Sequence, residues 1–217
     1  RGPLVAHGPH VVSRSTGERV KLTCVTWYGA EQLATVVGGL QHQEIRDLMQ
    51  RVHDSLFNCV RVPFSYATVM SNAFVTSQLL KRNSELWRGG DTTPLTLLTQ
   101  VVARLSAKGF YVILVNQNSV PSNDRCCSMC DGNGLWDRPT PPETPFAIWR
   151  TLLSRIADVA PHLAGIEIRN EPRAVCQQCT DNKPPTNCTI PVWKREKYGG
   201  SGSSSSGGGG SSSSCSS

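Results

Sequence analysis

The sequence lacks any long apolar run and any concentrated block of positive charge. No stretch approaches the roughly 18 apolar residues that a membrane-spanning helix needs. The 22 Lys and Arg residues outnumber the 16 Asp and Glu residues, giving a net charge of +6, but apart from residues 194–197 the basic residues are scattered. Nucleic-acid-binding proteins usually gather basic residues on one stripe or helix, with aromatic residues interleaved. We therefore expect neither a membrane nor a nucleic acid among the partners of this chain.

The sequence also lacks a signal peptide, and it begins with Arg rather than Met. We expect its start to be missing or processed, so this absence does not exclude export. The nine cysteines indicate an oxidising compartment, and the segment Asn187-Cys188-Thr189 is a glycosylation sequon that functions only in secreted proteins. These features predict a secreted, extracellular protein with disulfide bonds.

Residues 199–217 are almost entirely Gly and Ser. Such a segment buries too little apolar surface to offset its ordering entropy, so it is expected to be a disordered linker or tail. Residues 1–198 remain for structure, which is enough for one domain with a core.

The remaining sequence alternates apolar strand patterns with amphipathic helix patterns. After a hairpin over residues 4–20, strands are predicted at 21–27, 58–63, 110–116 and 163–169. Helices are predicted near 45–52, at 94–108, with Thr93 as its cap and Gly109 just past its end, and near 143–160. This β-α-β-α-β-α-β order is typical of parallel strands covered by helices. A doubly wound sheet and a (β/α)8 barrel both fit the pattern, although no Gly-rich phosphate loop follows the first strand.

Three further local predictions concern the first half of the chain. Pro63 is expected to close the second strand, and residues 65–91 are expected to be irregular. Cys24 and Cys59 lie in predicted strands and are interpreted as buried free thiols.

Unusual polar and aromatic residues lie where the predicted strands end. In a barrel the chemistry is found at the carboxyl ends of the strands. The residues at these positions are Trp27 and Tyr28, Arg61, Asn116 and Gln117, and Asn170 and Glu171.

Five stretches in consistent order resemble glycoside hydrolase family 5, the cellulase family of (β/α)8 enzymes. They are Trp27–Glu31, Phe57–Ser65, Gly109–Leu114, Asp131–Trp136 and Gly165–Arg173. The resemblance implies a TIM-barrel fold and a retaining endo-β-glucanase that takes a β-linked polysaccharide or oligosaccharide and needs neither a metal nor another cofactor.

The resemblance also implies roles for particular residues. Glu171 matches the general acid/base, Asn170 matches the residue that hydrogen-bonds the sugar 2-hydroxyl, and Arg61 matches the arginine that keeps the nucleophile ionised. The other expected substrate-binding residues are Asn116, Gln117, Trp27, Tyr28 and Trp136. Gln117 stands where the family usually has a histidine, and it does not titrate near neutral pH.

Each assignment has an alternative that the sequence leaves open. Asn170, Glu171 and Pro172 are also residues of an ordinary turn after a strand. Arg61 could form a structural ion pair with Glu167 or Glu171. The three aromatic residues fit a core as well as a sugar-stacking surface.

A second carboxylate for the retaining mechanism is not evident. The two carboxyl groups must lie about 5–5.5 Å apart, and the family's nucleophile ends the seventh strand. After Glu171 the only carboxylates are Asp181 and Glu196, neither in a strand pattern. We therefore expect a barrel truncated after its fourth strand. An alternative function is a catalytically inactive carbohydrate-binding fragment.

A third interpretation is a zinc-binding interaction module. Cys127 and Cys130, with Cys176 and Cys179, form two Cys-x2-Cys pairs that could supply four thiolates. Their separation is long for a zinc ribbon and further cysteines crowd both pairs, so disulfides between the two loops are favoured.

Overall fold

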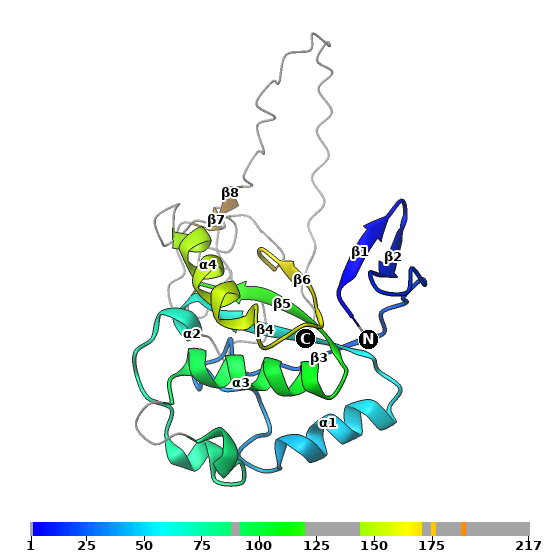
Figure 1. The fold of residues 1–217 in the computed structure, drawn as a ribbon. Coiled ribbons are helices and arrows are strands. Elements are labelled where there is room, and N and C mark those ends of the chain that lie inside the picture. The colour runs from blue at the N-terminus through cyan, green and yellow to red at the C-terminus, as the bar shows by residue number, and fades with distance from the viewer. Residues whose placement is uncertain (1, 88–91, 120–143, 171–174, 177–187, 190–217) are drawn as a thin grey trace.

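The computed structural model of the chain describes residues 2–87, 92–119, 144–170, 175–176 and 188–189. Four parallel strands form its central sheet in the order β3 (Cys24–Thr26), β4 (Cys59–Ser65), β5 (Tyr111–Asn118) and β6 (Leu163–Glu167). In chain order the helices α1 (Ile45–Asp54), α3 (Pro94–Ala107) and α4 (Thr144–Ile156) each connect two successive strands, and they lie outside the sheet (Figure 1). The predicted alternation and the parallel sheet are confirmed, with β3 shorter than expected.

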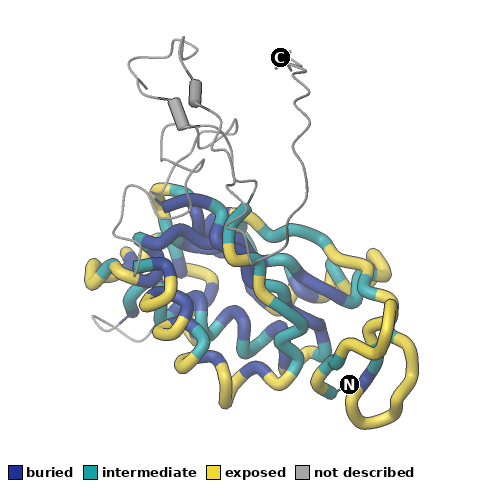
Figure 2. The backbone as a smooth tube through the Cα atoms, turned by 90° about the horizontal axis from the view of Figure 1, so that it is seen from above, coloured by how far each residue is buried: buried dark blue, intermediate teal, exposed yellow. Residues whose placement is uncertain are grey.

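The N-terminal hairpin is confirmed as well. Strands β1 (Leu4–His7) and β2 (His10–Ser13) pair antiparallel and belong to a sheet of their own. Gly8 in the connecting turn has φ +56°, a backbone region that favours glycine. Figure 2 shows that this hairpin is largely exposed, whereas buried residues concentrate in the sheet and the helices that pack on it.

Helix α3 follows the local signals in the sequence. The Thr93 hydroxyl accepts a hydrogen bond from Thr96 N. Pro94 takes the first helical position, where a backbone N–H would have no acceptor within the helix and its absence therefore costs nothing. Gly109 just beyond the helix has φ +93°. The buried face contains the four residues expected from the periodicity: Leu98, Val101, Val102 and Leu105.

The prediction that Pro63 closes the second strand is wrong, because β4 continues to Ser65. The Arg61 carbonyl faces β3, where it accepts a hydrogen bond from Trp27 N. The backbone nitrogen of Pro63, two residues further along β4, therefore points to the same side as the Arg61 carbonyl. On that side the paired part of β3 has already ended at Thr26. The missing N–H of Pro63 removes no hydrogen bond of the sheet.

The segment expected to be irregular contains regular structure. Helix α2 (Tyr66–Met70) starts directly after β4 with a capping box between Ser65 and Thr68. Two 3-10 turns follow, η1 (Ser77–Leu80) and η2 (Ser84–Leu86).

Two short strands, β7 (Val175–Cys176) and β8 (Cys188–Thr189), pair antiparallel nearer the C-terminus.

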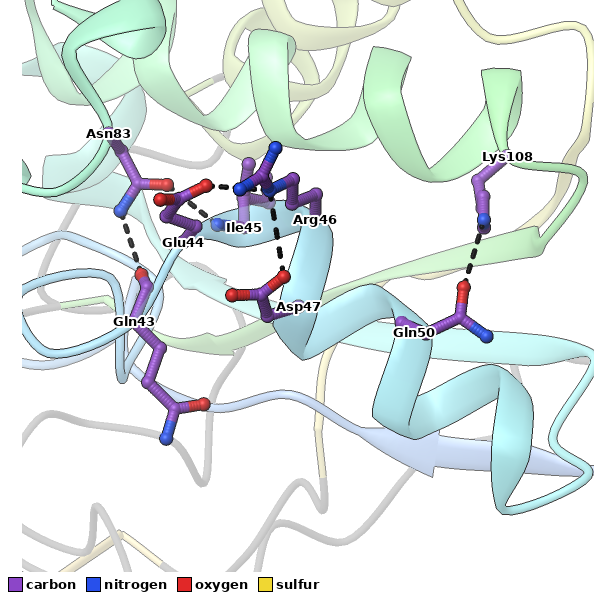
Figure 3. Close-up of polar contacts among 8 residues, drawn as sticks. All are labelled: Gln43, Glu44, Ile45, Arg46, Asp47, Gln50, Asn83 and Lys108. Carbon is purple, nitrogen blue, oxygen red and sulfur yellow. Dashed lines mark hydrogen bonds and ion pairs between the residues drawn. The ribbon is translucent and has the colours of Figure 1, made fainter.

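The start of helix α1 is held by a residue distant in sequence. The side chain at its N-cap, Glu44, makes no capping hydrogen bond, although it pairs with Arg46. Instead the Asn83 amide oxygen accepts from Ile45 N at 2.6 Å, and its amide nitrogen donates to the Gln43 carbonyl at 2.9 Å (Figure 3). The same nitrogen donates to the carbonyl of Leu40. Asn83 is fully buried, so three backbone groups depend on it.

The interpretation of Cys24 and Cys59 as free thiols is wrong, because the two residues form a disulfide. They stand opposite each other in the register of β3 and β4, with their Cα atoms 4.3 Å apart. The bond joins positions separated by 35 residues and ties β3 to the rest of the sheet.

Removal of this disulfide is expected to lower the free energy of unfolding by about 2–4 kcal/mol, because the unfolded chain gains loop entropy. Urea denaturation of the Cys24→Ser/Cys59→Ala double variant against wild type measures the loss. Peptide mapping of unreduced protein that finds Cys24 alkylated would show that the bond is absent.

None of the helices within the described residues is both long and apolar enough to cross a bilayer.

Candidate active site

The guanidinium of Arg61 reaches the carboxyl end of β6, although Arg61 is the third residue of β4 and not, as the sequence predicted, at the end of its strand. Arg61 Nε and Nη2 each donate to one carboxylate oxygen of Glu167, both at 2.7 Å, and Nη2 also donates to Asn170 Oδ1 at 2.9 Å. The arginine side chain is 18% exposed and that of Glu167 is 40% exposed. The bidentate geometry gives the pair directional strength as well as charge attraction. The sequence left Glu167 and Glu171 as possible ion-pair partners of Arg61, and the structure shows that Arg61 binds Glu167.

The turn after β6 is held by Asn116 on β5. The Asn116 carbonyl accepts from Asn170 N at 2.8 Å, and its side-chain oxygen accepts from Arg169 Nη1 at 2.6 Å. Arg169 also lies over the ring of Tyr66, 5.6 Å from its centroid, which is a cation–π distance. Asn116 is fully buried. In this structure its side chain therefore positions the turn that carries Asn170 and does not face solvent.

The two aromatic residues after β3 differ in their surroundings. Trp27 is half-buried against the hydrophobic core and donates through its ring nitrogen to the Gly38 carbonyl at 2.8 Å. Tyr28, the next residue, is 52% exposed. The core interpretation thus describes Trp27 better, whereas Tyr28 presents a ring to solvent, as a sugar-stacking residue must.

The loop that follows β3 also contains a buried carboxyl group, that of Glu31, to which the sequence analysis assigned no role. Glu31 is only 4% exposed, and its Oε2 accepts from Gly29 N at 2.8 Å. Burial raises the pKa of Glu31, against the opposing effects of two backbone N–H groups and of the positive charge of Arg61. Its position inside the Trp27–Glu31 stretch was visible in the sequence, but its burial was not.

Gln117 is half-buried on β5. Glu171 and Trp136 lie outside the described residues, as do Cys127, Cys130 and Cys179 of the zinc interpretation. Among the residues that the structure does describe, no three His, Cys, Asp or Glu side chains gather as metal ligands.

The described site consists of the ion pair between Arg61 and Glu167 and the amides of Asn116 and Asn170. It lies at the carboxyl end of β6, directly before Glu171 in sequence. Amide and guanidinium donors at such a site suit the binding of hydroxyl-rich ligands.

Comparison with known proteins identifies related sequences. A sequence profile of the family described as Cellulase (glycosyl hydrolase family 5) matches residues 17–193. A glycosyl hydrolase 5 family protein of Chamaecyparis obtusa is 31% identical over 185 residues, which are 79% of this chain and 33% of that protein. The major extracellular endoglucanase of Xanthomonas campestris is 30% identical over 169 residues, which are 77% of this chain and 32% of that protein. The chain thus spans about a third of the length of these curated relatives.

Solved structures show the same fold. The catalytic domain of the major endoglucanase from Xanthomonas campestris matches with a TM-score of 0.65 and 27% identity, covering 82% of this chain and 48% of that one. An endocellulase from Pyrococcus horikoshii in complex with cellotetraose matches with a TM-score of 0.63 and 21% identity, over 82% and 44% of the two chains. These neighbours imply a fold of the TIM-barrel type, to which the described residues contribute four parallel strands.

Proposed function

Because this chain belongs to glycosyl hydrolase family 5, the cellulase family, we propose that it forms the acid/base-bearing part of a retaining endo-β-glucanase, with Glu171 as the acid/base. The observation that carries this proposal is the set of contacts between Arg61, Glu167 and Asn170. They hold the residue directly before Glu171 at the sheet edge where barrel enzymes place their chemistry.

In the proposed reaction, protonated Glu171 donates its proton to the glycosidic oxygen while a second carboxylate attacks the anomeric carbon. The bond to the leaving sugar breaks and a covalent glycosyl–enzyme forms. Glu171, now ionised, then takes a proton from a water molecule that attacks the same carbon. The second carboxylate leaves, and the anomeric configuration is retained.

The other roles follow from the chemistry of each side chain. Arg61 favours the ionised form of the attacking carboxylate, because a nearby positive charge lowers the pKa of a carboxyl group. Asn170 donates its amide N–H to the sugar 2-hydroxyl, since its oxygen already accepts from Arg61. Tyr28 and Trp136 are proposed to contact sugar rings and Gln117 a sugar hydroxyl. Trp27, packed against the core, and Asn116, which holds the turn after β6, are proposed to support this surface from beneath.

The proposed substrate is a β-linked glucan, which is supported by the similarity to an endocellulase that binds cellotetraose. Secretion is proposed from the Cys24–Cys59 disulfide and from the relative described as extracellular. We also propose that residues 1–198 form the catalytic part and that residues 199–217 are a linker or tail.

The 217-residue chain by itself is expected to show little or no hydrolysis of carboxymethyl cellulose or cellotetraose, because a retaining mechanism needs a second carboxylate about 5–5.5 Å from the first. Reducing-sugar release by the purified chain measures this. Turnover by the chain alone that Glu171→Gln abolishes would contradict the expectation and show that both carboxylates are present.

A catalytically inactive carbohydrate-binding protein is the second candidate, since the exposed ring of Tyr28 and the amide of Asn170 suit sugar binding without a pair of carboxylates. The test is calorimetric titration of the natural full-length protein with cellotetraose. Binding without any hydrolysis would favour this second candidate.

A further inference from the structure

Glu167 is the last residue of β6, and the proposed reaction gives its carboxylate no part. Its two oxygens accept from Nε and Nη2 of Arg61, both at 2.7 Å, so the ion pair reaches across β5, which lies between β4 and β6. The Arg61 side chain is only 18% exposed, which limits the screening of this pair by water. A two-point contact of this kind fixes the plane of the guanidinium as well as its position.

One of the two nitrogen atoms that Glu167 binds also binds Asn170. Arg61 Nη2 donates to Glu167 Oε2 at 2.7 Å and to Asn170 Oδ1 at 2.9 Å. The oxygen of an Asn amide only accepts hydrogen bonds and its nitrogen only donates them, so a donor beside the oxygen decides which way the amide is turned. With Oδ1 on Arg61, Nδ2 is the amide atom directed away from the guanidinium.

The backbone of Asn170 is held by a different residue. Its N–H donates to the Asn116 carbonyl at 2.8 Å, and the Asn116 side chain accepts from Arg169 Nη1 at 2.6 Å. Asn116 is fully buried, so these contacts are shielded from water. The described contacts thus give the backbone of Asn170 one support, Asn116, and its side chain another, Arg61.

We propose that Glu167 is a positioning residue that acts through Arg61 on the side-chain amide of Asn170. The carboxylate orients Nε and Nη2 of Arg61, Nη2 holds Oδ1 of Asn170, and Nδ2 of that amide is thereby directed toward the ligand. If the ion pair served only to hold β4 and β6 together, its loss would lower stability without releasing the amide from its backbone. The consequence for the sugar 2-hydroxyl rests on the proposed function, whereas the effect on the amide does not.

The effect on the amide is tested by NMR relaxation on the 217-residue chain and its Glu167→Gln variant. Glutamine keeps the size of the side chain but replaces one acceptor oxygen by an N–H2 group, so one guanidinium N–H would face another donor. We expect the order parameter of the Asn170 side-chain amide to fall from the rigid range near about 0.85 to below about 0.6. The order parameter of the Asn170 backbone N–H should stay in the rigid range, because Asn116 still binds it.

Glu85→Gln, the same change at an exposed carboxylate of η2, is the matched control and should leave both order parameters as in wild type. A folded Glu167→Gln chain whose Asn170 side-chain amide stays rigid, or loses order together with the backbone N–H, would overturn the proposal. A wild-type Asn170 amide with an order parameter below about 0.6 would also overturn it, even if Glu167→Gln failed to fold.

The consequence for catalysis is tested in the complete hydrolase with two substrates, an aryl cellobioside and its analogue without the 2-hydroxyl on the ring at the scissile bond. Glu167→Gln is expected to lower kcat/KM for the first about tenfold more than for the second, because the analogue has no hydroxyl for Asn170 to bind. An equal loss on both substrates would show that Glu167 does not act through Asn170. No hydrolysis by the wild-type protein would count against the proposed function, and the NMR result would then decide the inference by itself.

Discussion

Under the proposed function, Glu171→Gln in the complete hydrolase is expected to lower kcat/KM for cellotetraose by about 10²–10⁴-fold, the usual contribution of a general acid/base. The amide has no proton of suitable acidity to give to the leaving oxygen. An aryl cellobioside with an acidic phenol as leaving group should be much less affected in its first step, because such an oxygen leaves without protonation. Reducing-sugar release and phenol release measure the two reactions.

Glu85→Gln is the matched control for this experiment, since it removes an exposed carboxylate outside the proposed site. It should hydrolyse both substrates as wild type does. Equal loss on both substrates in Glu171→Gln, or retention of cellotetraose hydrolysis, would remove Glu171 from the acid/base role.

Asn83→Ala is expected to lower the free energy of unfolding by about 3–5 kcal/mol, a large share of the stability of a domain of this size. The Asn83 side chain makes three hydrogen bonds, to Ile45 N and to the carbonyls of Leu40 and Gln43, and it is fully buried. Alanine would leave these backbone groups without their partner in the interior, and helix α1 would lose its cap. Urea denaturation followed by circular dichroism measures the change.

Asn72→Ala is a suitable comparison, because Asn72 is exposed in the segment after α2. Its effect should stay within about 0.5 kcal/mol, as for most surface substitutions. A loss at Asn83 no larger than that at Asn72 would mean that water or another group replaces its three contacts.

Helix α3 and the apolar strands could be predicted because their signals are local. Thr93, Pro94 and Gly109 mark the ends of α3 through their own backbone preferences, and these preferences act wherever the helix packs. The order of elements then limited the fold to parallel sheets covered by helices.

The errors concern features that depend on a neighbouring strand or loop. Pro63 stays within β4 because β3 ends at Thr26, which no pattern around Pro63 reveals. The Cys24–Cys59 bond depends on the register between two strands. Asn83 caps a helix that begins 38 residues earlier in the chain.

The sequence by itself determined the family, the class of fold and the strand-end positions where a site could form, because periodicity, turn residues and short motifs are properties of the chain alone. Only the tertiary structure decided that Arg61 binds Glu167, that Asn116 is buried beneath the turn that carries Asn170, and that Glu31 is a buried carboxyl. The physical reason is that burial and charge pairing depend on which strands lie side by side and in what register, and both are set by the packing of the whole sheet.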